Sequence, residues 1–326
     1  MNAPLNLAGL STSGLGVLAG LSTAVLWTAT AVCFELSSRR LGSLAVNVLR
    51  LAVAAVLFTA LSLLRTRQLL PAALSQEAWF YLSLSGLVGF VMGDVPLFQA
   101  FALIGARLSM LIYASVPLMT ALCGFLFLGE SMSGRALTGM AITVAGIAIA
   151  IGGRPKTAGT GHGARSRRTI GILMAFGGAA GQTGGLLLGK RGAIGLDSFA
   201  ATQIRVLAGL VGFLVVLLAA GRARALRDQL RKAVAPNGTA GDLAQLRSLR
   251  RALIVLCVGG LLGPFLGVSL GLLSTQLLPT GTAATLMSIV PVLLIPVSAL
   301  AFHERISWLE IIGAVLAVGG VAVLAS

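Results

Sequence analysis

The chain is 326 residues long, and its composition excludes a soluble enzyme, a disordered chain and a disulfide-rich secreted module. Apolar residues make up 57% of it and charged residues only 10%, against about 45–50% and about 25% in soluble domains. The formal net charge of +15 does not indicate nucleic-acid binding, because the Lys and Arg residues cluster in short gaps between apolar runs rather than over one hydrated face.

Ten apolar runs follow one another along the chain, each within the length of about 17–25 residues that a spanning helix needs. Most connections are short, which predicts antiparallel neighbours. Two connections are longer and basic, at residues 154–169 and 221–250. Leu226 and Leu230 recur at helical spacing among the basic residues of the second one, so an interfacial basic helix is predicted there, with a solvated loop as the alternative. The runs lie near residues 14–34, 43–64, 79–101, 108–128, 136–153, 170–189, 198–220, 251–274, 281–302 and 309–325.

An internal duplication is the most informative feature of the sequence. Early in each half the shift is 171 − 16 = 155, which places Gly16 on Gly171 and Arg50 on Arg205; later it is 260 − 86 = 174. Each copy holds five runs, an odd number, so the two copies must enter the membrane in opposite directions. Inverted repeats of this kind are typical of transporters, with the substrate site near the midplane between the halves. The later matches are Gly86 with Gly260, Gly89 with Gly263, Gly93 with Gly267, Pro117 with Pro291, Glu130 with Glu304, Gly139 with Gly313 and Gly146 with Gly320.

Two segments in the duplicated part resemble the end of an EamA-type repeat in the drug/metabolite transporter superfamily. They are SVPLMTALCGFLFLGESMSGRALTGMAITVAGIAIA and IVPVLLIPVSALAFHERISWLEIIGAVLAVGGVAVL. Both carry a mid-helix proline, an acid at the helix end and two spaced glycines, and Trp27 and the NVLRLAV segment around Arg50 fit as well. The second copy departs from the pattern, because His303 stands where the first has the glycine before its glutamate.

The resemblance covers nearly the whole chain and implies an all-α membrane protein with ten transmembrane helices in two inverted five-helix repeats. The first repeat would occupy residues 14–153 and the second residues 170–325, joined by the basic linker at 154–169, with the basic loop 221–250 inside the second repeat. It further implies that the first, third and fourth helix of each repeat line the cavity.

The implied function is that of a multi-pass secondary transporter in the cell membrane, moving a small metabolite such as an amino acid or a related compound, commonly by export. Its partners would be the substrate, the lipid bilayer and, if transport is coupled, protons; the sequence does not set the oligomeric state. No catalytic constellation, metal-ligand cluster or cofactor motif is visible. The alternative is a membrane-embedded lipid-handling protein or enzyme acting on an isoprenoid or acyl substrate, which would need several polar side chains converging near one interface.

The charge distribution and the family resemblance predict opposite orientations. On the side of the first connection lie 17 of the 24 Lys and Arg residues, and five lie on the side that carries both termini. Enrichment of Lys and Arg in the cytoplasm therefore places both termini outside, whereas the resemblance implies that both are cytoplasmic. The two longest connections supply most of the excess and count less in this rule, so the preference for outside termini is slight.

Asp94 is the acid that lies deep inside an apolar run, and its counterpart in the second copy is Val268 (268 − 94 = 174). A carboxylate inside a bilayer is costly unless it is paired, hydrated or protonated. Three hypotheses follow for Asp94: a structural group that is paired with Arg50 or bonded in its protonated form to a neighbouring helix, recognition of a substrate amine, or proton coupling.

The other candidates are polar side chains at mid-helix positions. Arg50 and Arg205 match between the copies, and the alternatives for both are a structural role or snorkelling to the headgroups. Trp27 and Gln182 also match in position but differ in chemistry, as the two sides of a substrate pocket would; packing and an interhelical hydrogen bond are the alternatives. Weaker candidates are Asn47, Gln99, Tyr113 and Ser288.

Four prolines inside the runs predict helix kinks around the cavity, because proline frees a backbone carbonyl of the preceding turn. Glu130 and Glu304 are predicted to anchor helix ends, with a gating role as the alternative. The four prolines are Pro117, Pro264, Pro291 and Pro296.

Overall fold

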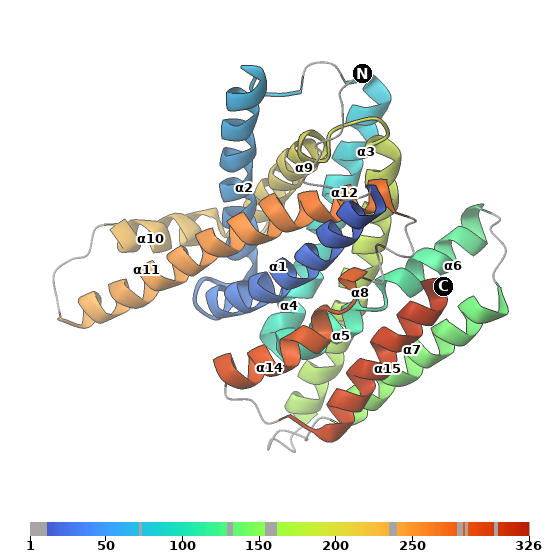
Figure 1. The fold of residues 1–326 in the computed structure, drawn as a ribbon. Helices are drawn as coiled ribbons and strands as arrows, with labels where there is room; N and C mark the ends of the chain where they lie inside the picture. The colour runs from blue at the N-terminus through green and yellow to red at the C-terminus, as the bar shows by residue number, and fades with distance from the viewer. Residues whose placement is uncertain are drawn as a thin grey trace.

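In the computed structural model every regular element of the described residues is a helix (Figure 1). Six helical segments are long and apolar enough to cross a membrane, and two shorter apolar helices, Leu137–Gly152 and Trp308–Val323, accompany them. The chain is therefore an all-helical protein with the features of a multi-pass membrane protein. The described residues are 12–71, 74–128, 133–153, 162–234, 240–278, 283, 286–302 and 306–325.

The helices of the first half follow the predicted runs, with one break. The run predicted at 108–128 is interrupted by a turn at 114–115. Gly105, between the third and fourth runs, has a φ of 81°, a conformation that glycine adopts at little cost. The elements are α1 (Thr12–Leu41), α2 (Ser43–Thr66), α3 (Gln76–Gly86), the π-helix η1 (Leu87–Asp94), α4 (Val95–Ile104), α5 (Ala106–Tyr113), α6 (Val116–Leu128) and α7 (Gly134–Gly153).

The second half is more helical than the sequence predicts. The connection expected at 154–169 is already helical from His162, and helices occupy most of the connection expected at 221–250. Leu226 is buried against the core while Arg224 and Arg227 are exposed, so the predicted basic amphipathic helix forms there. The elements are α8 (His162–Gly192), α9 (Ser198–Ala219), α10 (Ala223–Val234), α11 (Ala240–Gly260), the π-helix η2 (Leu261–Gly267), α12 (Val268–Leu277), α14 (Val290–Phe302) and α15 (Trp308–Ala325).

The two π-helical segments stand at matched positions of the duplication. They begin at Leu87 and Leu261, and 261 − 87 = 174 is the shift of the sequence repeat. Pro264 lies inside η2, and Pro96 is the second residue of the helix that follows η1. Because proline cannot donate the hydrogen bond of a regular α-helical turn, a wider turn at this point accommodates it. The structure thus contains a π-helix at the same position in each half, which the sequence pattern does not predict.

The two halves interlock rather than fold side by side. Helix α1 packs against α11, η2 and α12 of the second half, and its counterpart α8 packs against α3, η1 and α4 of the first. Helix α2 packs against α9, and α7 packs against α15 (Figure 1). Exchanging the halves reproduces each of these contacts, so the most extensive helix packing joins one repeat to the other.

Glycines set the closest of these contacts. A Cβ built on Gly146 of α7 would lie 2.4 Å from the backbone nitrogen of Ala317, and one on Gly320 of α15 would lie 2.5 Å from that of Thr143. These positions exchange under the 174-residue shift, so the crossing is itself symmetric. Glu130 and Glu304, the predicted helix-end anchors, lie outside the described residues.

Candidate functional site

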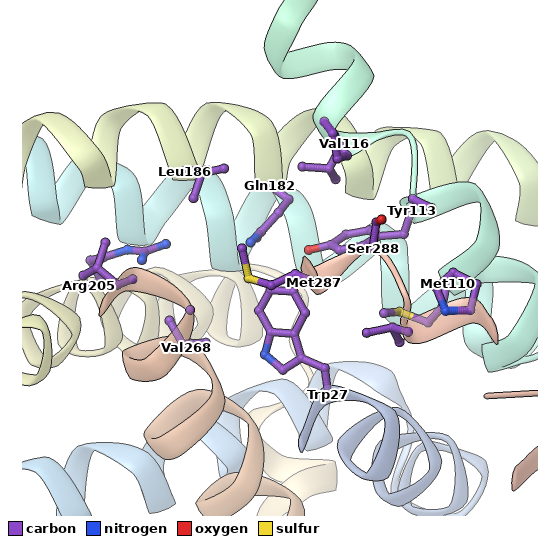
Figure 2. Close-up of a pocket in the computed structure, with 16 residues that line it drawn as sticks. Trp27, Met110, Tyr113, Val116, Gln182, Leu186, Arg205, Val268, Met287 and Ser288 are labelled. Atoms are coloured by element: carbon purple, nitrogen blue, oxygen red, sulfur yellow. The ribbon is translucent and has the colours of Figure 1, made fainter. Parts of the chain in front are cut away.

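Two adjoining cavities lie between the halves and share six lining residues; together they are called the central cavity here. Figure 2 shows side chains from both halves around the first of them, which leaves about 710 Å³ free of protein atoms out to its open mouth. The walls of the central cavity as a whole come from the first, third and fourth helical run of each half, as the family resemblance implied, and the second run of each half adds an arginine. The shared residues are Trp27, Met110, Tyr113, Gln182, Arg205 and Val268.

Helix ends, and not only helix faces, form part of this wall. Pro117 and Pro291 are each the second residue of a helix, α6 and α14, directly after a two-residue turn, and both line the cavity. The helix therefore breaks before these prolines, which fit without cost into a first turn, instead of kinking around them. Pro264 lines the cavity from η2, whereas Pro296 is exposed within α14 and does not reach it.

Asp94 forms a buried ion pair with Arg50, whose Nη2 donates to the carboxylate Oδ2. Arg50 also donates from Nε to Oδ1 of Asn47 at 2.9 Å, and the Asn47 side-chain nitrogen donates to the carbonyl oxygen of Ser43 at 3.0 Å. Asn47 is fully buried and is not among the lining residues of the cavity, so it orients the Arg50 side chain from the side away from the cavity. The charge of Asp94 is thus compensated within its own half.

Aromatic rings enclose the same arginine. The Arg50 guanidinium carbon lies 4.7 Å from the ring centroid of Phe98, 5.3 Å from that of Phe34 and 5.9 Å from that of Phe90. Rings at this range stabilise a cation that is removed from water. Only 5% of Arg50 is exposed, so snorkelling to the headgroups is the wrong interpretation of this residue.

Arg205 is equally buried, at 4% exposed, but it has fewer partners. Its guanidinium carbon lies 5.6 Å from the Phe90 ring, and its Nε has no hydrogen-bond partner among the described residues. None of the ion pairs of the described residues includes it. It lines both parts of the central cavity, so snorkelling is the wrong interpretation here as well.

The remaining sequence candidates divide between the cavity and the outer surface. Trp27 and Gln182 face each other across the cavity from α1 and α8, and Tyr113 and Ser288 line it near the two helix breaks (Figure 2). Gln99 is exposed on the outside of α4 and takes no part.

Sequence reasoning missed the apolar part of the wall, which includes Met110, Met287 and Val268. Nothing in the sequence distinguishes these methionines from others in the apolar runs. Val268 could have been found, because it is the residue that the duplication aligns with Asp94.

The arrangement suits the binding of a small molecule with an apolar body and a few polar groups. In the first cavity polar atoms come from side chains such as Tyr113, Gln182, Arg205 and Ser288, and the larger part of the surface is carbon. Arg50 and Asp94 add charged groups in the second. In the described part of the chain, no three His, Cys, Asp or Glu side chains gather as a metal site would require.

The chain belongs to the EamA-like transporter family, whose model matches it twice, over residues 14–152 and 169–326. The two matches cover nearly the whole length and coincide with the two halves of the fold. This is a family of membrane transporters of the drug/metabolite type and not of enzymes.

Solved structures show the same fold. In a match entitled "Crystal structure of protein" the TM-score is 0.61 at 19% sequence identity, covering 94% of each chain. In all, 27 chains of solved structures match. No curated protein matches the chain.

Proposed function

We propose that this protein is a secondary transporter that moves a small amphiphilic metabolite across the cell membrane by alternating access between two inverted repeats. The observation that carries the proposal is the interlocking of the halves around the central cavity. Helix α1 packs on the third run of the opposite half, and α8 does the same in return. Because the two arrangements are equivalent in topology, the halves can exchange conformations and turn an opening on one side into an opening on the other.

The proposal includes ten membrane segments. Six helices have the length and apolarity of full spans, and α7 and α15 are shorter apolar helices. The two remaining segments are the broken fourth and ninth runs, whose turns face the cavity at 114–115 and 288–289. Irregular backbone at membrane depth is tolerated where it lines a cavity and is buried by protein, as here.

The cavity lining supports an amino acid or a related compound as the substrate. Trp27, Met110 and Met287 offer an apolar surface, and Gln182 and Tyr113 place polar groups next to it. Export is the direction that the family resemblance supports. Proton coupling through Asp94 requires release of its bond to Arg50, whereas a facilitator requires no such step.

Flux through purified protein tests the proposal. The protein is reconstituted in liposomes, and counterflow of labelled amino acids, amines and nucleosides is measured against empty liposomes. We expect saturable flux for at least one class. Absence of flux for every class, together with formation of a product from an isoprenoid or acyl lipid, would establish the alternative of a lipid-modifying protein.

Alternating access has a separate test at Ser288, which lines the cavity. In a background where Cys33, Cys123 and Cys257 are replaced by serine, Ser288→Cys is labelled with a membrane-impermeant thiol reagent from either side. We expect labelling from both sides, with the substrate changing the ratio. Labelling from one side alone under all conditions contradicts the proposal.

A further inference from the structure

We propose that Arg205 binds a carboxylate of the transported molecule, in the place where the other half of the protein supplies the carboxylate of Asp94 to Arg50. The inference rests on the proposed transport function and deepens it by naming the substrate class: a small carboxylate with an apolar body. It follows from comparing the surroundings of two arginines that the duplication makes equivalent.

The first difference lies at the Nε atoms. Arg50 donates from Nε to Asn47, at 2.9 Å. The residue equivalent to Asn47 is Thr202 (202 − 47 = 155), and its hydroxyl donates to the carbonyl oxygen of Ser198 at 2.7 Å. The Nε of Arg205 is consequently left without a partner among the described residues. Leaving a buried donor without a hydrogen-bond partner is unfavourable, and more so when the donor is charged.

The second difference is the missing acid. Arg50 donates to Asp94, and Asp94 aligns with Val268 in the other half. Val268 and Arg205 both line each part of the central cavity, and both are labelled in Figure 2. Valine has replaced the carboxylate while the arginine has been kept. The residues that line the central cavity therefore include two guanidinium groups and one carboxylate, which is already bonded to Arg50.

The third difference is the aromatic enclosure. Phe34 and Phe98, which lie over Arg50, align with Gly189 and Leu272 (189 − 34 = 155; 272 − 98 = 174). A Cβ built on Gly189 would lie 3.4 Å from the Arg205 guanidinium carbon, so the guanidinium packs directly against this glycine, at the position where a ring lies over Arg50 in the first half. Arg205 thus lines both parts of the central cavity with one ring near it, whereas Arg50 lines one part and lies among three rings.

These three differences favour a carboxylate as the group that binds Arg205. The guanidinium presents a planar fork of donors that matches a carboxylate in two parallel hydrogen bonds. Arg205 forms no direct ion pair among the described residues, and Asp94, which attracts it from a greater distance, is already bonded to Arg50. A bound anion would offset the cost of burying this second cation. Trp27, Met287 and Leu186 lie on the same cavity and would contact an apolar body attached to the carboxylate. Recognition of a substrate amine by Asp94 is disfavoured, because Arg50 occupies that acid.

The binding experiment uses three compounds with one body and different charge: 3-phenylpropanoate, 3-phenylpropanamide and 3-phenylpropylamine. Thermal unfolding of the purified protein in detergent is followed with each compound. We expect the anion alone to raise the unfolding midpoint, because a ligand that binds only the folded state stabilises it. Palmitate is included to distinguish a lipid carboxylate from a small-molecule one; a response to palmitate alone overturns the small-substrate class.

The decisive variant places a carboxylate at position 268, where the duplication aligns Val268 with Asp94. Val268→Asp is expected to lower the affinity for 3-phenylpropanoate at least tenfold, because the new carboxylate takes the donors of Arg205. Val268→Asn, of matched size and without charge, is the control for the change of shape, and it should bind 3-phenylpropanoate at least tenfold more tightly than Val268→Asp does. Without ligand, Val268→Asp should unfold at no lower temperature than Val268→Asn, because its charge is paired. A Val268→Asp protein that is less stable than the control, or that binds the anion as wild type does, overturns the inference.

Flux measurements separate this inference from the proposed function. If the anion binds with the expected variant pattern and no compound is transported, the site stands and the transport proposal fails. If neutral or cationic compounds are transported and the anion neither binds nor is transported, the transport proposal stands and the carboxylate site fails.

Discussion

A Cβ on Gly146 of α7 would lie 2.4 Å from the backbone nitrogen of Ala317 in α15, so these two helices cross with their backbones in contact. Helix α7 ends the first half of the chain and α15 ends the second. The residue at 146 therefore controls a contact between the repeats and is not among the lining residues of the central cavity. Small residues at such crossings allow the close approach on which packing between membrane helices depends.

Gly146→Leu is expected to destabilise the protein by at least about 1–3 kcal/mol, because the new side chain has no space in a packed interface. Gly152 lies in the same helix with no atom within 4 Å of its Cβ position, so Gly152→Leu is the matched control and should change stability little. The midpoint of thermal unfolding in detergent measures both. Equal midpoints for the two variants would contradict the crossing.

Breaking the buried ion pair of Asp94 with Arg50 is expected to lower the free energy of unfolding more than breaking an exposed ion pair does. Asp94→Asn leaves Arg50 charged and unpaired, which costs about 3–5 kcal/mol in buried pairs. The pair of Glu77 with Arg191, at 3.2 Å, is 65% and 61% exposed, and Glu77→Gln should cost about 0–1 kcal/mol. Thermal unfolding of both variants at one pH is the measurement, and a larger loss for Glu77→Gln is the result that the structure does not allow.

The same acid provides the test of proton coupling. If Asp94 releases Arg50 on binding a proton, transport per folded molecule should depend on pH in the wild type and lose that dependence in Asp94→Asn. Flux is measured between about pH 5.5 and 8, a range that brackets carboxylate and histidine titration. Parallel pH profiles for the two proteins would remove Asp94 from the coupling mechanism.

Trp27 is expected to bind the apolar body of the substrate. It lines both parts of the central cavity, whereas Trp308, at the start of α15, is 79% exposed. Trp27→Ala should lower the affinity for transported compounds about tenfold, which corresponds to about 1.4 kcal/mol of lost contact. Trp308→Ala should leave affinity unchanged, and concentration-dependent flux measures both; a loss shared by the two variants would indicate general misfolding.

Membrane orientation follows from fusions to the C-terminus. The distribution of Lys and Arg places both termini outside. An alkaline-phosphatase fusion should then be active and a fluorescent-protein fusion dark. An inactive phosphatase beside a glowing fluorescent protein would place the termini in the cytoplasm, as the family resemblance implies.

Much of the architecture was predictable because it depends on local patterns. The apolar runs predicted the helices, since a helix in lipid must satisfy its own backbone and expose carbon. The matched glycines and prolines predicted the duplication, and the family resemblance implied which runs line the cavity. The helical start of α8 before residue 169 was not predictable, because its basic residues resemble those of a solvated loop.

The roles of individual polar residues were less accessible. Asn47 and Gln99 are both polar groups inside apolar runs, yet one is fully buried behind Arg50 and the other faces outward. Their difference depends on which face of a helix meets another helix. No pattern within a single run contains that information.

By itself the sequence determined that this is a duplicated helical membrane protein and placed an arginine at the same position in each half. The tertiary structure alone decided that the two arginines differ in role. Arg50 is closed in by an acid, an amide and three rings, while Arg205 keeps its charge at the wall of the cavity without an acidic partner among the described residues. The physical reason is that the free energy of a buried charge depends on the hydrogen-bond partners, counter-ions and rings around it. Those groups come from helices that are distant in the chain.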